Sequence, residues 1–227
     1  MTDRSAQAGH AGPAVVLVLG TGTEVGKTWV GAAMARALVA RGLRVAARKP
    51  AQSYDPGDDD AGRTDAQVLA AATGEDPTAV CPPHRWYPRA LAPPMAAAEL
   101  GRPVPTIAEL AAEVAPPPGA DVVLVETAGG VRSPLAGDGD GLDLGARLAV
   151  TATVLVADPG LGTINSVRLS AAAVAVAGLP APAVFLNRFD PADPLHTANR
   201  DWLRDRDGFD CVTAVADLAD RLAPTGP

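Results

Sequence analysis

The chain has 227 residues and a formal net charge of −7, which argues against a basic face for binding nucleic acid. Apolar residues make up 48% of the chain, enough for a packed core, but no apolar run reaches the roughly 18 residues of a membrane span. The first residues are small and polar, unlike a secretory signal. We therefore expect a cytoplasmic protein that acts without membrane or nucleic acid.

Alternating strands and helices are predicted along the chain after a disordered tail at residues 1–12. Continuous apolar runs are typical of buried parallel strands, and they occur at 14–20, 43–48, 121–126, 152–158 and 182–187. Helices are predicted at about 26–40 and 164–177, with a short one starting near 64–65. The proline-rich segment 81–94 is predicted to be an irregular loop over the site.

This order of elements predicts an α/β fold: a doubly wound, mainly parallel sheet with helices on both faces. We expect residues 13–227 to form one domain, because no repeat or linker divides them. Parallel strands bring their carboxyl ends to one edge, where ligands bind. Five segments should meet there: 20–28, 49–53, 126–130, 158–165 and the residue Asn187.

The segment GTGTEVGKT (20–28) predicts a phosphate site. It is a variant of the P-loop, with glycines six and four residues before the second conserved glycine rather than five. Backbone amides of Glu24, Val25 and Gly26 should cradle the phosphates, while Lys27 reaches the β- and γ-phosphates and Thr28 coordinates Mg²⁺.

Lys27 and Lys49 are the only lysines, beside 17 arginines. An ammonium is a compact point charge, whereas a guanidinium is wider and planar, so lysine is favoured beside a single phosphate oxygen. Lys49 follows the second strand, across from the P-loop, and we expect it to stabilise charge on a transferring phosphoryl group and its acceptor. The alternative is that Lys49 has no such role and merely ends a strand.

Carboxylates for Mg²⁺ are expected among residues at the same edge. Glu126 ends a fully apolar strand, where a carboxylate needs a cation or hydrogen-bond donors. Asp65 is the second candidate, and the open alternative is a helix-start residue stabilised by the helix dipole. The run Asp58–Asp60 is predicted to be a solvated loop. Thr23 and Ser53 are candidates for hydrogen bonds to the acceptor, unless they only cap turns.

The motifs GTGTEVGKT, KPAQS, TDAQ, VETAGG, GLGTIN and FLN resemble, in this order, those of dethiobiotin synthetase, over about residues 15–190. The resemblance implies an enzyme that carboxylates 7,8-diaminononanoate with CO₂, phosphorylates the carbamate from ATP and closes a cyclic urea. It implies that Lys27 holds the γ-phosphate and that Lys49 stabilises the carbamate and the phosphoryl group. Thr28, Asp65 and Glu126 would bind Mg²⁺.

The same resemblance assigns the remaining sites. Thr23 and Ser53 would contact the diamine and carbamate, with Glu24, Gly129 and Gly130 beside them, and Asn187 would contact adenine. It further implies a homodimer with shared sites, in which Gly162, Thr163 and Asn165 reach the partner's substrate. Without the resemblance, Asn165 would be interpreted as a helix cap.

Four departures from the family pattern bear on the substrate. Thr127 stands where the family usually has glycine, and so does Tyr54, whose side chain either crowds the diamine pocket or points outward. The APPM segment (92–95) lacks a histidine often found there. The chain after Asn187 lacks the usual Gly-x-Ile-Pro segment, which leaves the nucleotide preference open.

Two other functions remain open from the sequence. One is a relative that kept the ATP machinery but acts on another substrate, or only regulates. The other is a ParA/MinD-like ATPase switch, but the extra lysine of its loop is replaced here by Gly22, and no amphipathic membrane helix closes the chain. Dependence of ATP turnover on the diamine and CO₂ distinguishes a synthetase from a switch.

Overall fold

A computed structural model describes residues 12–57 and 64–223. The predicted tail, apart from Gly12, and the run Asp58–Asp60 therefore lie outside the described residues. Among the residues described, no helix is long and apolar enough to cross a bilayer.

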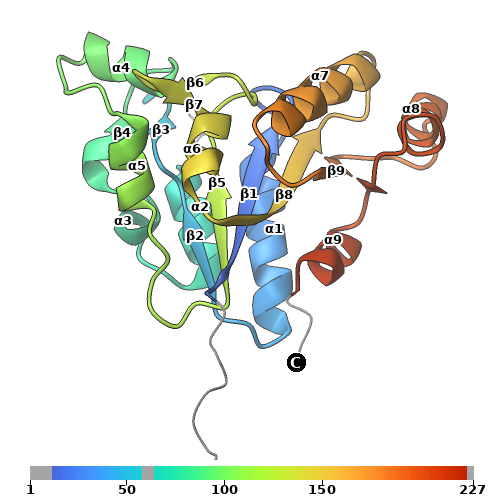
Figure 1. The fold of residues 1–227 in the computed structure, drawn as a ribbon, viewed down its shortest axis with the longest axis horizontal. Helices are drawn as coiled ribbons and strands as arrows, with labels where there is room; N and C mark the ends of the chain where they lie inside the picture. The colour runs from blue at the N-terminus through green and yellow to red at the C-terminus, as the bar shows by residue number, and fades with distance from the viewer. Residues whose placement is uncertain (1–11, 58–63, 224–227) are drawn as a thin grey trace, which may run out of the picture.

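The described residues form a parallel six-stranded sheet in the order β10-β9-β8-β1-β5-β2 (Figure 1). Its strands in chain order are β1 (Ala14–Gly20), β2 (Val45–Arg48), β5 (Val122–Glu126), β8 (Val150–Ala157), β9 (Pro182–Leu186) and β10 (Cys211–Val212). Two smaller sheets are a parallel pair, β3 (Gln52–Ser53) with β4 (Trp86–Tyr87), and an antiparallel pair, β6 (Pro134–Ala136) with β7 (Gly139–Asp140).

Helices cover both faces of the main sheet. One face carries α1 (Lys27–Ala40), α2 (Asp65–Thr73), α3 (Pro77–Val80) and α9 (Val215–Leu222). The other carries α5 (Ile107–Glu113), α6 (Gly141–Arg147), α7 (Thr163–Val176) and α8 (Pro194–Asp205). The helix α4 (Pro93–Glu99) packs instead on the small β3–β4 sheet, through Ala96 and Ala97 against Tyr87.

The central strand β1 shows why its sequence is apolar without interruption. Val16 and Val18 face the core under α1 and α2, whereas Leu17 and Leu19 face the core under α6 and α7, and all four are fully buried. Successive side chains of a strand point to opposite faces, so a strand covered on both sides needs apolar residues at every position.

The outer edge of β2 is closed by the segment between α2 and α3 rather than by another strand. The backbone amide of Ala47 donates to Glu75 Oε2 at 2.8 Å, and that of Lys49 donates to the carbonyl of Val80 at 2.8 Å. The other carboxylate oxygen of Glu75 accepts from the buried Arg48 guanidinium at 2.8 Å. These bonds fix the backbone at the end of β2 and at Lys49, the first residue after the strand.

The predicted fold class is confirmed, and the five predicted strands and three predicted helices are present. The first strand has the predicted ends, and most other ends are shifted. The helices α3, α5 and α6 and the strands β3, β6 and β7 were not predicted, and further features were missed or wrong. The sheet has a further strand, β10, and two amphipathic helices, α8 and α9, follow Asn187. The segment 81–94 is not wholly irregular: it holds a 3₁₀ turn (Pro83–Arg85), the strand β4 and the first turn of α4.

Candidate active site

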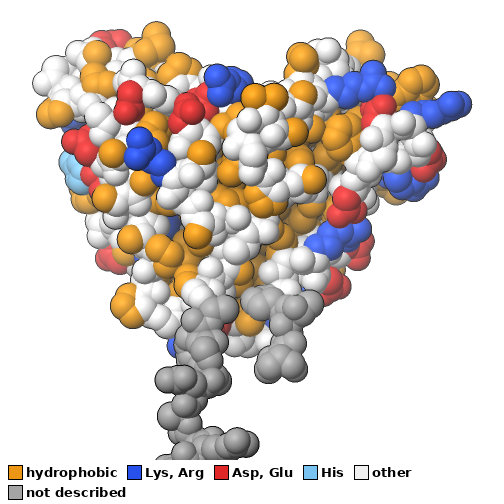
Figure 2. Space-filling model, in the orientation of Figure 1, with side chains coloured by type: hydrophobic (Ala, Val, Ile, Leu, Met, Phe, Trp, Pro, Cys, Tyr) orange, Lys and Arg blue, Asp and Glu red, His pale blue; other side chains and the backbone are white. Residues whose placement is uncertain are grey.

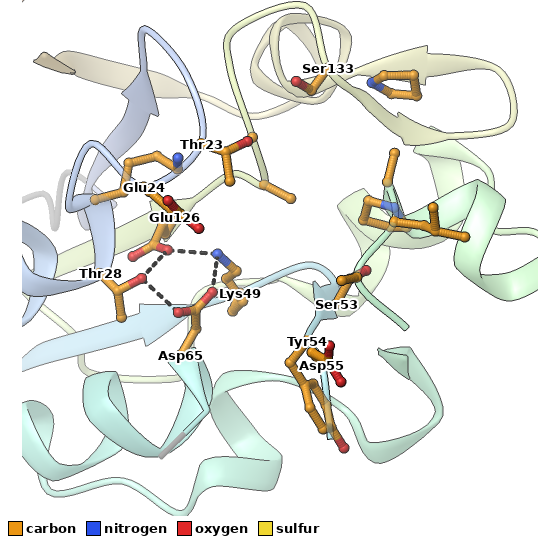
Figure 3. Close-up of a pocket in the computed structure, with 18 of the residues that line it drawn as sticks. Thr23, Glu24, Thr28, Lys49, Ser53, Tyr54, Asp55, Asp65, Glu126 and Ser133 are labelled. Carbon is orange, nitrogen blue, oxygen red and sulfur yellow. Dashed lines mark hydrogen bonds and ion pairs between the residues drawn. The ribbon is translucent and has the colours of Figure 1, made fainter. Parts of the chain in front are cut away.

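A cavity of about 680 Å³ opens at the edge of the sheet where β1, β2 and β5 end. Its floor combines the P-loop with Lys49, Asp65 and Glu126, and Figure 3 shows these side chains converging from separate elements. The predicted meeting of the segments after these three strands is therefore present in the structure.

The P-loop leaves the first turn of α1 open toward this cavity. Gly26, the residue before the helix, has a φ of 89°, and no side chain caps the amides that follow. Unpaired amides at a helix start, together with the helix dipole, form an anion site. Glu24 also has a positive φ, of 60°, which is uncommon for a residue with a side chain.

Lys27 lies folded back over its own loop. Its ammonium donates to the carbonyl of Gly22 at 2.9 Å, and a Cβ at Gly20 would come within 2.9 Å of the Lys27 side chain. Gly20 is therefore required by this close approach. Burial and the nearby charge of Lys49 lower the pKa of Lys27 to about 8, against the opposing effect of Glu126 and Asp65.

A closed ring of four side chains forms the floor of the cavity (Figure 3). The Lys49 ammonium lies 2.6 Å from Glu126 Oε1 and 2.7 Å from Asp65 Oδ2. The Thr28 hydroxyl lies 2.7 Å from Asp65 Oδ1 and 2.8 Å from Glu126 Oε1. The ring joins the start of α1, the end of β2, the start of α2 and the end of β5.

The charges in this ring depend on one another. Burial alone would lower the pKa of Lys49, but Asp65 and Glu126 outweigh it and hold that pKa above its usual range. Burial would likewise raise the pKa of Asp65, and Lys49 reverses this and lowers it. For Glu126, burial prevails over the attraction of Lys49, so the pKa of this carboxyl is raised.

The interpretation of Asp65 as a helix-start residue is confirmed, and its role as a magnesium ligand stays a prediction. It is the first residue of α2, after a capping box made by Thr64 and Gln67, and its carboxylate points into the ring. The side chain of Gln52 fixes this helix start from the β3 side, since its Oε1 accepts from the amide of Ala66 at 3.0 Å.

The donor set fits Mg²⁺. Thr28, Asp65 and Glu126 offer hard oxygens within one cluster, and Glu126 Oε2 is buried without a hydrogen-bond partner. The described residues hold no group of three or more His, Cys, Asp or Glu side chains suited to a metal. Two carboxylates and a hydroxyl suit Mg²⁺, which takes one or two carboxylates and completes its shell with water and phosphate oxygens.

The opposite wall of the cavity is formed by Ser53, Tyr54 and Asp55, by the stretch 90–93, and by Ser133 with Pro134. Ser53 Oγ is buried without a partner, so it has a hydrogen bond to offer. Thr23 lies on the P-loop side of the cavity, while the ring of Tyr54 turns away from the four-residue ring (Figure 3). The stretch 90–93 bears out the predicted position of the proline-rich segment over the site.

Gly129 and Gly130 form a tight turn beside the P-loop. Gly129 has a φ of 66°, and a Cβ there would come within 2.5 Å of Ser133 Oγ. A Cβ at Gly130 would come within 3.4 Å of the carbonyl of Thr21, and the Gly130 amide donates to Ser133 Oγ at 2.9 Å. Ser133 was not predicted from the sequence, because a serine in a loop carries no distinguishing pattern.

Asn187 is buried and bonds directly to the P-loop. Its Nδ2 donates to the carbonyl of Val25 at 3.0 Å, and a Cβ at Gly26 would come within 2.1 Å of this nitrogen. Asn187 follows β9, which lies on the other side of β1 from β5 and β2, and it is not among the residues that line the cavity.

Thr127 does not line the cavity. Its side chain is buried against the start of α6, where a Cβ at Gly141 would come within 2.8 Å of Thr127 Cγ2. Its amide donates to the carbonyl of Val18 at 3.1 Å. This departure from the family pattern is accommodated by a glycine across the contact, and the Thr127 side chain does not line the cavity.

Gly162, Thr163 and Asn165 do not line the cavity of their own chain. Gly162, with a φ of 92°, precedes α7, and Asn165 lies inside the helix, so the interpretation of Asn165 as the helix cap is wrong. Thr163 Oγ1 is buried without a partner.

Together, the doubly wound sheet, the glycine-rich loop opening onto a helix and the two lysines facing two carboxylates define a P-loop protein. A family model described as an AAA domain matches residues 14–221. The chain belongs to the dethiobiotin synthetase family. It is 36% identical to the ATP-dependent dethiobiotin synthetase of Anaeromyxobacter dehalogenans, covering 93% of this chain and 95% of that one.

Two further relatives are similar over comparable lengths. The ATP-dependent dethiobiotin synthetases of Streptomyces coelicolor and Rhodococcus jostii are each 38% identical, over 92% of this chain and 87% and 89% of theirs. Membership of this family decides against the ATPase switch. Among solved structures, chloroplast FtsY from Physcomitrella patens is similar in fold alone, with a TM-score of 0.50 and 18% identity over 98% of this chain and 69% of that one.

Proposed function

We propose that this chain is an ATP-dependent dethiobiotin synthetase that forms the ureido ring from 7,8-diaminononanoate, CO₂ and ATP. Family membership over nearly the whole chain supports this function. The observation that carries it is the cavity in which Lys27 and Lys49 approach from two strand ends beside Asp65 and Glu126. Such a site can neutralise the charge that develops when a phosphoryl group moves from ATP to an anionic acceptor.

The phosphates of ATP would lie against the open amides at the start of α1, over Glu24, Val25 and Gly26. Lys27 would exchange its bond with the Gly22 carbonyl for a phosphate oxygen, a stronger charge-assisted bond. We assign the adenine contact to the region of Asn187, which is anchored to the same loop through Val25.

Thr28, Asp65 and Glu126 would hold Mg²⁺, and their oxygens and the buried free Oε2 of Glu126 support this assignment. When bound, the ion would neutralise negative charge on the β- and γ-phosphates.

Reaction would proceed on the side of Ser53 and Thr23. One amine of the diamine adds to CO₂ and loses a proton, giving a carbamate, whose oxygen attacks the γ-phosphorus as ADP leaves. The second amine then attacks the carbonyl carbon and loses a proton to solvent, and phosphate departs as the ring closes. Lys49 would stabilise the carbamate and the phosphoryl group in flight, while Ser53 Oγ would donate a hydrogen bond and Gly129 and Gly130 would shape the wall.

We further propose a homodimer with shared sites. Gly162, Thr163 and Asn165 lie outside their own chain's cavity, and the open start of α7 would suit the substrate carboxylate of a partner. Leu169 and Val176 on α7 are exposed, and so is Leu161 just before the helix. Hydrophobic side chains are visible on the surface in the region of α7 (upper right in Figure 2). The single domain over 13–227 and the cytoplasmic location also remain proposals.

The direct test is phosphate release by the purified chain with Mg-ATP and bicarbonate, with and without 7,8-diaminononanoate, with the product mass measured in parallel. We expect release that depends on the diamine and a product of dethiobiotin mass. Release that ignores the diamine would contradict the function and indicate another acceptor, with Tyr54 as the first wall residue to examine.

The two lysines are expected to differ in effect. Lys27→Ala should weaken nucleotide binding by roughly 10- to 100-fold, because a charge-assisted bond to phosphate is lost. Lys49→Ala should leave nucleotide binding nearly unchanged but lower synthesis by about 100-fold or more, the usual cost of removing a group that stabilises developing charge. Calorimetry with ADP and single-turnover product formation measure these effects. Near-normal turnover by the Lys49→Ala variant would show that Lys49 does not stabilise the phosphoryl group.

A further inference from the structure

The ammonium of Lys49 occupies the place between the two carboxylates of the floor. It lies 2.6 Å from Glu126 Oε1 and 2.7 Å from Asp65 Oδ2, and only 3% of its side chain is exposed. Thr28 completes the ring with one hydroxyl that touches both carboxylates (Figure 3). The three residues that touch Lys49 or close its ring are therefore the same three that would hold Mg²⁺.

A divalent cation and this ammonium cannot share these oxygens. Mg²⁺ binds its oxygens at about 2.0–2.1 Å in a near-octahedral shell, and a second positive charge at hydrogen-bond distance from the same oxygens is repelled strongly in a buried site. Lys49 can move away from the cation, because it lines the cavity and its long side chain can turn toward the phosphate side.

Lys27 is placed differently. Its ammonium donates to the Gly22 carbonyl at 2.9 Å, and within the described part of the chain it forms no ion pair with a carboxylate. It still feels the charges of Lys49, Glu126 and Asp65. The two lysines thus carry the same charge and lie near the same carboxylates, but only Lys49 contacts the proposed metal-binding residues directly.

We propose that Lys49 is an internal competitor of the divalent cation: it occupies the Asp65–Glu126 pair until the metal binds, and metal binding releases it into the cavity. The proposal rests on the metal assignment made under the proposed function. It deepens the role of Lys49, since the side chain becomes available to the phosphoryl group only when the metal is in place. Premature contact of Lys49 with an acceptor is thereby prevented.

The test is Mn²⁺ binding to the nucleotide-free chain, followed by electron paramagnetic resonance. If the ammonium occupies the carboxylate pair more than nine-tenths of the time, its removal in Lys49→Met should tighten Mn²⁺ binding by about tenfold or more. The matched control is Lys27→Met, which removes the same charge nearby without opening the pair and should give a clearly smaller effect. If Mn²⁺ binding tightened equally in both variants, loss of one nearby positive charge would explain the effect, and the proposal would be overturned.

A second measurement needs no variant and protects against misfolding of Lys49→Met. Lys27 and Lys49 are the only lysines, so acylation of the wild-type chain can be mapped by mass spectrometry to just these two side chains. Adding Mn²⁺ should accelerate acylation of Lys49 relative to Lys27. An unchanged ratio at a Mn²⁺ concentration that saturates binding would contradict the release of Lys49. If Mn²⁺ binds to neither the wild type nor the variants, the metal assignment itself fails, and the inference fails with it.

Discussion

Thr127 stands where the family usually has glycine, and its larger side chain is accommodated by packing against another glycine. The side chain is directed away from the cavity and packs on Gly141, the first residue of α6, which has no side chain to oppose it. The two residues form a matched pair at the contact between the end of β5 and the start of α6.

We expect Gly141→Ala to lower the free energy of unfolding by about 1–3 kcal/mol, because its methyl group would come within 2.8 Å of Thr127 Cγ2. Thr127→Ala in the same chain should recover most of this loss, and chemical denaturation of the two single variants and the double variant measures the coupling. Additive effects would show that the contact does not cause the loss.

The two cysteines allow a test of pH-dependent reactivity. Burial raises the pKa of Cys81 to about 12 and that of Cys211 to about 11. At pH 8 the thiolate of Cys81 then falls from about a tenth of the molecules to about one in ten thousand, so the native thiol should react at least about 100-fold more slowly than in urea. Labelling with Ellman's reagent in both conditions checks this. Fast native labelling of Cys81 would contradict its burial.

At the residue scale, the sequence could predict those site residues whose charge is costly to bury without a partner. A carboxylate that ends an apolar strand (Glu126) and a lysine in a chain that otherwise uses arginine (Lys49) each require a partner, and the structure joins them. Ser133 and Asp55 could not be predicted, since loop hydroxyls and acids are common. Their place on the cavity wall depends on the folding back of segments far apart in the sequence.

At the scale of elements, the position of Lys49 depends on how β2 ends. Glu75 accepts from the Ala47 amide and the Arg48 guanidinium, so one carboxylate replaces a neighbouring strand and neutralises a buried charge. Glu75→Ala should cost about 2–3 kcal/mol of the free energy of unfolding, because the Ala47 amide loses its acceptor and the buried Arg48 loses its counter-charge.

Glu75→Gln is the matched variant, since its amide oxygen can still accept from Ala47 while the charge is lost. Its cost should be smaller than that of Glu75→Ala, and urea denaturation measures both. Equal costs would show that the hydrogen bond to the edge of β2 contributes nothing.

The predicted strands were those with continuous apolar runs, whereas the 12-residue helix α8, which is mostly polar, was missed. Apolar runs in β1 and β5 are buried on both faces and cannot be mistaken for loops, whereas two-residue strands such as β10 have no periodicity to detect. The proline-rich segment was judged by composition alone. Pro93 stands in the first turn of α4, a position where its missing amide costs nothing, so proline there starts a helix rather than preventing one.

At the scale of the whole molecule, the face of α7 invites a test of the proposed dimer. On α7, Leu169 and Val176 are 65% and 90% exposed, and Leu161, which precedes the helix, is 93% exposed. Apolar side chains gathered on one helix mark a surface for contact.

Leu169→Glu should shift the chain from dimer to monomer in light scattering after size exclusion, because association would bury an unpaired charge. Synthesis should fall with the dimer if sites are shared, while nucleotide binding should persist. Trp202→Glu on α8, where Trp202 is 47% exposed, is the control and should leave the mass unchanged. A monomeric wild type with full synthesis would exclude shared sites.

The closure of β2 by Glu75 and Val80 also limits how copies of this chain can meet. A bare strand edge is a template on which another chain adds a strand, and such growth has no natural end. Here one margin of the main sheet has its outward amides at Ala47 and Lys49 already bonded, and the other margin, β10, is two residues long. Association between copies is therefore favoured through helix faces, where each face binds a single partner. Open-ended growth by addition of strands at the sheet edges is disfavoured.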